Sequence, residues 1–315
     1  TTDAQQAMFY IQMLNPDSTS YNITQVIELK KEVDEERLEE AIMKVIAKHE
    51  ILRTSFEITE GKVVQVIQEQ PQLIFRHEVD QSQNLKEVIE DLIKPFKLVK
   101  EIPFRMNLFK WQESIILLMD IHHINFDGIS IEVFKNDLLG AYQGIDIGTP
   151  ELQFKDFSEW QQTDEFQARL DSQLSYWVQK FEQQVEDVNL PYDFDHQDMV
   201  KGTGHHFSYH LQSELSKHIV QQATETNAGL FNYLLTAAFI LIHKYSQQRD
   251  LVIGTGTQGR NFPGLREVMG NFVNTVAYRV EVKPELSHRM LLAEVKNTVN
   301  EGLENQDYPY EQLVS

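Results

Sequence analysis

Two adjacent histidines, an aspartate and a glycine lie close together in the sequence His-His-Ile-Asn-Phe-Asp-Gly, at residues 122–128. Histidine titrates closer to neutral pH than any other unperturbed side chain, so it suits proton transfer. The sequence directly follows an apolar run at residues 115–119, which predicts a buried strand over residues 115–121. A histidine delivered by the end of a buried strand, with Gly128 breaking the chain direction, indicates a functional site.

Three kinds of chemistry could use His122, His123 and Asp127. Two histidines and a carboxylate could bind a metal, but neighbouring residues at a strand end point to opposite sides, and no other ligand-spaced motif occurs. Serine or cysteine hydrolysis has no visible nucleophile, because the chain has no cysteine and no Gly-x-Ser-x-Gly sequence. General acid–base or positioning catalysis needs only one histidine that faces the substrates. The residues alone do not decide between this catalysis and a purely structural interpretation. In the structural interpretation, both histidines lie in the core and Asp127 caps the next helix.

The composition limits the class of protein. A length of 315 residues predicts about two domains or lobes, and the apolar fraction of 41% predicts a sizeable core. The net charge of −20 argues against nucleic acid and anionic membrane as partners, because both attract clustered Lys and Arg. No stretch is long and apolar enough to span a bilayer, and no basic-then-apolar leader is present, so we expect a cytoplasmic protein.

Helical and strand patterns alternate along the chain. Residues 34–49 form the clearest amphipathic helix, with Leu38, Ile42 and Val45 on one face, and Asp3 is expected to cap a short first helix. The alternation predicts an α/β fold with two similar lobes, and Gly144, Gly148 and Pro150 mark a linker between them. The remaining strands are expected at residues 23–29, 63–67, 73–77, 104–109, 205–211, 251–254 and 272–282, and the remaining helices at 85–93, 129–142, 154–185, 214–226, 230–245 and 290–303.

A second histidine pair, His205 and His206, serves as an internal comparison. It lies in an alternating segment with Phe207 and Tyr209 and has no Asp-Gly pair behind it. We assign it no chemistry.

The His-His-x-x-x-Asp-Gly sequence resembles the signature of the condensation domains of nonribosomal peptide synthetases, which are related in fold to chloramphenicol acetyltransferase. Further stretches resemble other motifs of this family, in the order that the family has. They are Ala-Gln-Gln-Ala-Met-Phe-Tyr at residues 4–10, Lys-His-Glu-Ile-Leu-Arg-Thr-Ser-Phe at 48–56, Phe-Lys-Asp-Phe-Ser-Glu-Trp at 154–160, Met-Gly-Asn-Phe-Val-Asn-Thr at 269–275 and Asn-Gln-Asp-Tyr-Pro-Tyr-Glu at 305–311.

The resemblance implies a fold of two chloramphenicol-acetyltransferase-like lobes in a V-shaped pseudo-dimer. We expect the N-terminal lobe, which carries the histidine motif, at residues 1–149, and the C-terminal lobe at 150–315. The family continues past the Gln-Asp-Tyr-Pro motif, so the second lobe is expected to be incomplete at Ser315.

The resemblance also implies a reaction, namely amide formation between a donor acyl or peptidyl thioester and an acceptor aminoacyl thioester. Both are held on phosphopantetheine arms of carrier domains, so the domain itself needs no cofactor or metal. The implied partners are an upstream donor carrier, a downstream acceptor carrier and an adjoining adenylation domain, in the production of a peptide antibiotic or siderophore.

The resemblance implies a role for each motif residue. His123 is expected to face the acceptor amine, either accepting its proton or holding it in the neutral state. His122 is expected to point away and support the loop, and the Gly128 N–H is a candidate oxyanion donor.

Asp127 is expected to brace the loop by pairing with an arginine rather than to transfer protons. Arg260 is the first choice for that arginine, and Arg53 is the second. Both arginines are thus expected as structural support.

Two alternatives remain open. Epimerisation domains share the His-His-x-x-x-Asp-Gly signature but invert an α-carbon, and they need no acceptor. The other alternative is a non-catalytic module that only docks carriers or recruits other enzymes.

Overall fold

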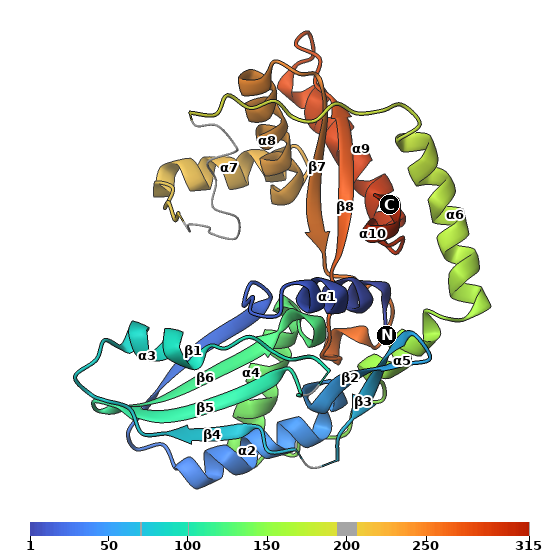
Figure 1. Cartoon of the computed structure of the whole chain (residues 1–315). Helices are drawn as coiled ribbons and strands as arrows, with labels where there is room; N and C mark the ends of the chain where they lie inside the picture. Colours follow the sequence, from blue (N-terminus) through green and yellow to red (C-terminus); the bar gives the residue numbers. More distant parts are fainter. Residues whose placement is uncertain (70, 100, 194–206, 315) are drawn as a thin grey trace. The chain divides into compact units, whose positions relative to one another are not determined.

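The fold is mixed α/β, as predicted, with helices and strands alternating along the chain (Figure 1). The computed structural model describes residues 1–69, 71–99, 101–193 and 207–314.

The chain divides into two compact units, and the division differs from the predicted boundary between residues 149 and 150. The first unit comprises Thr1–Ala168 and Gln258–Val273, and the second comprises Arg169–Thr257 and Asn274–Ser315. Gln258–Val273, here called the return segment, comes back to the first unit after the chain has entered the second. The boundary moves past residue 149 because the short helix that follows packs its phenylalanines into the core of the first unit.

A four-stranded sheet organises the first unit. Its strand order is β1-β6-β5-β4, in which β4 pairs with β5 in parallel and the other neighbours are antiparallel. The strand bounds are Asn22–Lys30 for β1, Ile74–His77 for β4, Phe104–Trp111 for β5 and Ser114–His122 for β6.

Alternation along β6 sends successive side chains to two different cores. Ile115, Leu117 and Met119 belong to the main core, which also contains the apolar faces of the long helices α2 and α4. Ile116 and Leu118 pack on the opposite face, against α3. With a period of two, His122 lies on the same face as Leu118. These helices span Glu35–Lys48 for α2, Leu85–Leu92 for α3 and Gly128–Gln143 for α4.

Helix α2 forms as its pattern predicts. The Asp34 side chain caps it by accepting a hydrogen bond from the Arg37 N–H, and Leu38, Ile42 and Val45 are buried. The strands and helices predicted for residues 23–142 are all present, with end shifts of a few residues.

Two local predictions are wrong, and one strand of the first unit was not predicted. Thr2, not Asp3, caps α1 (Asp3–Leu14), because its hydroxyl and the Gln5 side chain form a reciprocal capping box. The predicted helix over residues 154–185 is two helices, α5 (Phe154–Trp160) and α6 (Asp164–Lys180), separated by a turn. A strand that was not predicted, β2 (Thr54–Thr59), pairs with β3 (Lys62–Ile67) as a hairpin.

The second unit contains a two-stranded antiparallel sheet with helices. Phe239, Tyr278 and Val295 are at the centre of its core. Residues 207–211 of the predicted strand at 205–211 are not a strand, and His205 and His206 lie outside the described residues. The element bounds are Asp250–Thr257 for β7, Asn274–Glu281 for β8, Ser213–Glu225 for α7, Leu230–Ser246 for α8, His288–Glu304 for α9 and Tyr310–Leu313 for α10.

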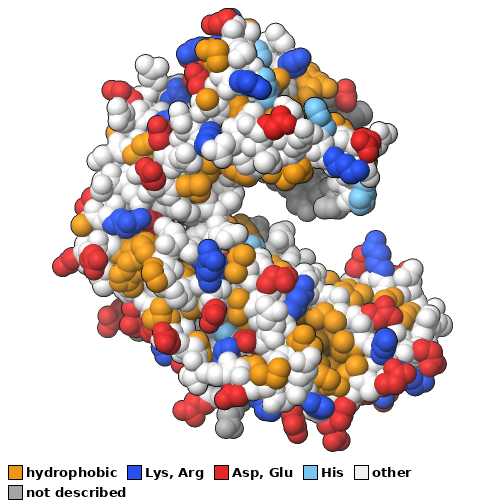
Figure 2. Space-filling view, turned by 180° about the vertical axis from the view of Figure 1, so that it is seen from behind, with side chains coloured by type: hydrophobic (Ala, Val, Ile, Leu, Met, Phe, Trp, Pro, Cys, Tyr) orange, Lys and Arg blue, Asp and Glu red, His pale blue; other side chains and the backbone are white. Residues whose placement is uncertain are grey.

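The charged residues are spread over the surface. Figure 2 shows Lys and Arg side chains scattered among acidic ones on the face that it presents. Among the described residues, no single helix is long and apolar enough to cross a membrane, although α7 and α8 pass this test as a pair bent by 107°.

Candidate active site

The end of β6 and the start of α4 hold the histidine motif in the first unit. The strand ends at His122, His123–Asn125 forms a single 3₁₀ turn, and α4 begins at Gly128. Five residues therefore separate a central strand from the positive end of a sixteen-residue helix.

His122 is enclosed within the protein. It is fully buried, its Nδ1 accepts a hydrogen bond from the Ile124 N–H at 3.0 Å, and its Nε2 lies 3.3 Å from Oε1 of Gln12. Burial, and secondarily the neighbouring His123, lower the pKa of His122 to about 4. Both ring nitrogens are thus engaged inside the protein, and the ring is neutral at physiological pH.

His123 is in a different environment. The residue is half-buried, and its Nδ1, which is itself enclosed, has no hydrogen-bond partner among the described residues. Its backbone is held firmly, because its N–H donates to the Tyr21 carbonyl at 2.7 Å and its carbonyl accepts from the Phe126 N–H at 3.3 Å. The main chain is therefore fixed, while no group within the described part of the chain holds the ring through Nδ1.

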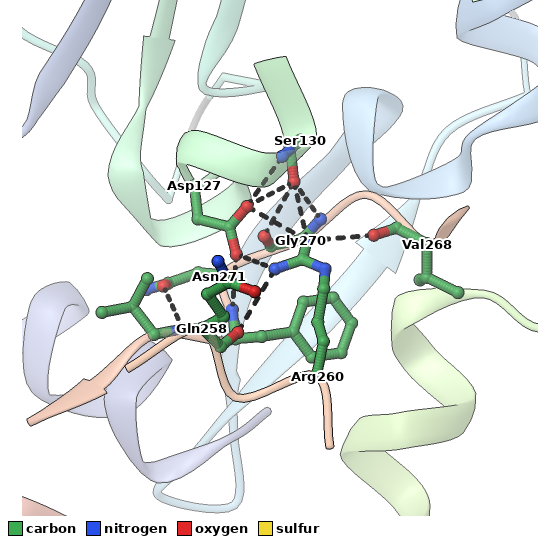
Figure 3. Close-up of polar contacts among 9 residues, drawn as sticks. Asp127, Ser130, Gln258, Arg260, Val268, Gly270 and Asn271 are labelled. Atoms are coloured by element: carbon green, nitrogen blue, oxygen red, sulfur yellow. Dashed lines mark hydrogen bonds and ion pairs between the residues drawn. The ribbon is translucent and has the colours of Figure 1, made fainter. Parts of the chain in front are cut away.

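Asp127 is fully buried and lies against Arg260, the arginine that we expected to pair with it (Figure 3). Nη1 of Arg260 contacts Oδ2, and Nη2 lies 3.0 Å from Oδ1, which is a two-point contact between guanidinium and carboxylate. Oδ1 also accepts from the N–H and the hydroxyl of Ser130 at 2.9 and 2.8 Å, and Oδ2 accepts from the Phe272 N–H at 3.2 Å. Asp127 thus caps α4 and anchors the return segment, and its oxygens bond to these donors and not to His123.

The return segment is shaped to bring Arg260 to this carboxylate. Arg260 also donates to the Val268 carbonyl at 3.1 Å, and its guanidinium lies 4.2 Å from the centre of the Phe272 ring. Gly259 has φ +62°, and a Cβ there would lie 1.8 Å from the Phe272 carbonyl oxygen. Gly270 likewise leaves no room for a side chain, since a Cβ would lie 2.0 Å from the Phe154 ring. Only glycine fits at either position.

Arg53, the second choice, makes its contacts elsewhere. Its Nη1 lies 2.5 Å from the Gln68 carbonyl oxygen, and its Nη2 lies 3.9 Å from Glu50. Arg53 therefore has partners other than Asp127 and lies directly before β2.

Gly128 is exposed at the first position of α4. Its N–H is among the first helical amides, which have no partner within the helix. A Cβ at this position would meet nothing within 4 Å. Steric crowding inside the protein therefore does not explain the glycine.

Three polar residues of the site were missed in the sequence. Ser130 joins the Asp127–Arg260 pair, and its hydroxyl also accepts from the Gly270 N–H at 3.0 Å. Asn125 donates to the carbonyls of Ile51 and Thr54 at 3.0 and 2.9 Å and is fully buried. Gln12 contacts His122. A polar residue on the apolar stripe of a helix was the available signal for Gln12, because a buried amide needs partners.

The described residues contain no group of three or more His, Cys, Asp or Glu side chains that could hold a metal ion. The site thus consists of one fixed neutral histidine, one half-buried histidine and a buried ion pair that joins two segments of the chain.

A family model described as "Condensation domain" matches residues 1–315, so the chain belongs to the condensation domain family.

The curated relatives are large synthetases. The chain is 33% identical to Surfactin synthase subunit 2 of Bacillus subtilis (strain 168) over 99% of its own length and 9% of the relative's. It is 35% identical to Tyrocidine synthase 3 of Brevibacillus parabrevis over 99% of its own length and 5% of the relative's. The chain therefore spans only a small part of the relatives that it matches.

Solved structures support the fold. The condensation domain from Monacolin K polyketide synthase superposes with a TM-score of 0.84 at 20% identity, covering 99% of this chain and 74% of that one. The X-domain from teicoplanin biosynthesis superposes with a TM-score of 0.83 at 22% identity, covering 98% and 71%. A second structure of that X-domain is a complex with OxyB.

Proposed function

We propose that this chain is a peptide-bond-forming condensation domain. The reaction joins a donor acyl or peptidyl thioester to an acceptor aminoacyl thioester, both tethered by phosphopantetheine. The acceptor nitrogen forms a bond to the donor carbonyl carbon, the carbon–sulfur bond breaks, and the displaced sulfur leaves as a thiol with the proton that the amine loses.

One observation carries this proposal. In the His-His-x-x-x-Asp-Gly motif, the polar atoms of His122 and Asp127 are bonded within the protein, whereas His123 is only half-buried and its enclosed Nδ1 has no partner among the described residues. His123 is therefore the motif side chain available to a substrate. Packing alone gives no reason for this difference between neighbouring histidines.

We further propose that His123 acts mainly by holding the amine neutral and oriented. In a catalytic triad, an aspartate stabilises the imidazolium that forms when histidine takes a proton. Here Asp127 is bonded to Arg260 and to α4, and Nδ1 of His123 has no partner among the described residues. The ring thus lacks the group that would stabilise its charged form. Holding two tethered reactants in line could supply about 7–11 kcal/mol of the barrier.

The remaining assignments complete this proposal. The Gly128 N–H, at the open start of α4, donates a hydrogen bond to the developing oxyanion. The two compact units are the two chloramphenicol-acetyltransferase-like lobes, with an upstream and a downstream carrier domain and an adenylation domain as partners. The domain works in the cytoplasm with phosphopantetheine as the tether of its substrates and holds no cofactor of its own.

The test is product formation by the full-length protein with both carriers loaded. His123→Ala should lower the rate of amide formation by about 10²-fold or more without changing the melting temperature. His218→Ala, a histidine of α7 in the second unit, is the matched control and should leave the rate unchanged. Near-normal turnover of His123→Ala would remove this residue from the mechanism.

The two alternatives give other results in the same assay. An epimerisation domain would invert the α-carbon of a single loaded aminoacyl carrier with no acceptor present. A recruitment module would form no amide with any pair of carriers but would still bind a partner, and the OxyB complex of the structurally similar X-domain gives this outcome a precedent in the fold.

A further inference from the structure

We propose that Gln12 is a positioning residue for His123, which it controls through the ring of His122. The inference rests on the function proposed above, since it names the group that holds the reactive histidine in place. Gln12 determines which nitrogen of His122 carries the proton. The position of that proton determines the conformation of the 3₁₀ turn that carries His123.

The orientation of the Gln12 amide follows from its surroundings. Its Nε2 lies 3.1 Å from the carbonyl oxygen of Ser18, with the carbonyls of Asn15 and Pro16 at 3.4 and 3.5 Å. Carbonyl oxygens only accept hydrogen bonds, so the amide nitrogen must face them. Oε1 then faces His122, 3.3 Å from its Nε2, which is slightly longer than a typical hydrogen bond between nitrogen and oxygen. An amide oxygen only accepts, so Nε2 of His122 carries a hydrogen.

The other ring nitrogen requires the same tautomer. Nδ1 of His122 lies 3.0 Å from the backbone nitrogen of Ile124, which is a donor, so Nδ1 must be an acceptor. A proton on Nδ1 would place two hydrogens against each other and break the contact. Burial keeps the ring neutral, so its two tautomers are the states that Gln12 can choose between.

Other polar groups near His122 do not replace Gln12 as the acceptor. Asp120 lies on the same face of β6, but its carboxylate is bonded to Arg105 at 3.1 Å and to Asn22 at 2.8 Å. The rings of Tyr21 and Phe96 lie 5.8 and 6.3 Å from the His122 ring, centre to centre. The remaining titratable neighbour, His123, is next in sequence and contributes to the low pKa of His122.

The proton on His122 affects His123 because the turn between them is short. His122 caps the 3₁₀ turn through the Ile124 N–H, and His123 is the first residue of that turn. The Ile124 carbonyl accepts from Nε2 of Gln5 at 3.1 Å. Helix α1 therefore holds the turn with two amides, one on each side of Phe9.

The sequence of α1 places both amides correctly. Gln5, Phe9 and Gln12 are its buried residues and are spaced by four and three positions, which puts them on one helical face. Gln5 and Gln12 are nearly fully buried, and a buried amide is costly unless it is bonded. Both amides are directed to the histidine turn.

Nitrogen NMR of the full-length protein labelled in its histidine rings tests the first step. Wild-type His122 should show a protonated Nε2 and an unprotonated Nδ1. Gln12→Met keeps a similar length but removes the acceptor, so part of the population should move its proton to Nδ1 and the Ile124 amide signal should shift. Gln6→Met makes the same change on α1 away from the buried stripe and should leave both signals unchanged.

The second step is tested by condensation with loaded carriers. Gln12→Met should lower kcat about 10–100-fold with little change in KM, because a misplacement of about 1 Å can cost up to 10²-fold in rate. A wild-type His122 protonated on Nδ1 would overturn the proposal even if Gln12→Met failed to fold. Unchanged ring signals in the variant, or changed signals with unchanged kcat, would overturn it too. If the wild type forms no amide, the proposed function fails, while the ring signals still decide whether Gln12 governs His122.

Discussion

Replacing Asp127 by alanine should destabilise the first unit and loosen two segments together. The substitution leaves the Arg260 guanidinium, which is 2% exposed, without its carboxylate. Breaking a buried pair in this way costs about 3–5 kcal/mol, and loss of a helix cap alone costs about 0.5–2 kcal/mol. The same carboxylate serves both roles, so these costs overlap, and we expect about 4 kcal/mol in total. This is a large part of the roughly 5–15 kcal/mol that stabilises a typical domain.

Amide hydrogen exchange locates this effect. Peptides covering α4 and the return segment should exchange faster in Asp127→Ala, while those of α9 in the second unit should not change. Glu132→Ala removes an acid from the same helix that pairs with Lys135 on the surface, and it should cost less than about 1 kcal/mol. An Asp127→Ala variant with wild-type exchange in α4 but no condensation would refute the bracing role and assign Asp127 to the chemistry.

Two further substitutions test the geometry. Gly128→Ala should leave folding intact, since a Cβ there meets nothing within 4 Å, yet it should slow condensation if the donor carbonyl must approach this N–H; equal rates would contradict that approach. The His122 pKa of about 4 lies below the ordinary 6.5, so between pH 4 and 6.5 the unfolded chain binds more protons than the folded chain. The unfolding free energy should therefore rise by roughly 3 kcal/mol as pH increases through this window. Burial raises the pKa of Asp120 to about 6, so the contribution of Asp120 to the unfolding free energy falls as pH increases from about 4 to 6. Denaturant titrations of Asp120→Asn should therefore show a steeper rise of the unfolding free energy with pH than the wild type.

The periodic elements of the first unit could be predicted because local pattern and tertiary packing agree there. Helix α2 has a capping residue, a single apolar face and no competing signal. The pattern failed where a helix break depends on packing. Residues 161–163 form a turn between α5 and α6, although they carry no proline or glycine. Trp160, which ends α5, packs against Phe166 of α6 at 4.7 Å between ring centres. Residues six positions apart do not share a face of a continuous helix, so this contact depends on the break.

The division into units could not be predicted because it depends on contacts across long sequence separations. Gly148 and Pro150 mark a real loop, but the phenylalanines of α5 pack beside Phe272 of the return segment at 4.9 and 4.8 Å. Composition does not indicate that a segment more than a hundred residues later completes the core of the first unit. The Asp127–Arg260 pair spans this separation, and the family resemblance rather than any local pattern suggested it.

The two histidines of the motif are the same residue type in adjacent positions, and their different roles come from the backbone. A strand alternates its side chains, so the last residue of β6, His122, follows Leu118 and Asp120 to the buried face. His123 belongs to the turn, where alternation no longer applies and the ring is half-buried. The two residues therefore depend on each other. The buried ring of His122 accepts a hydrogen bond from the Ile124 N–H, and this bond closes the turn that carries the half-buried ring of His123. If His122 were to face the substrate and His123 were to be buried in its place, β6 would have to shift by one residue. That shift would also turn Ile115, Leu117 and Met119 out of the main core.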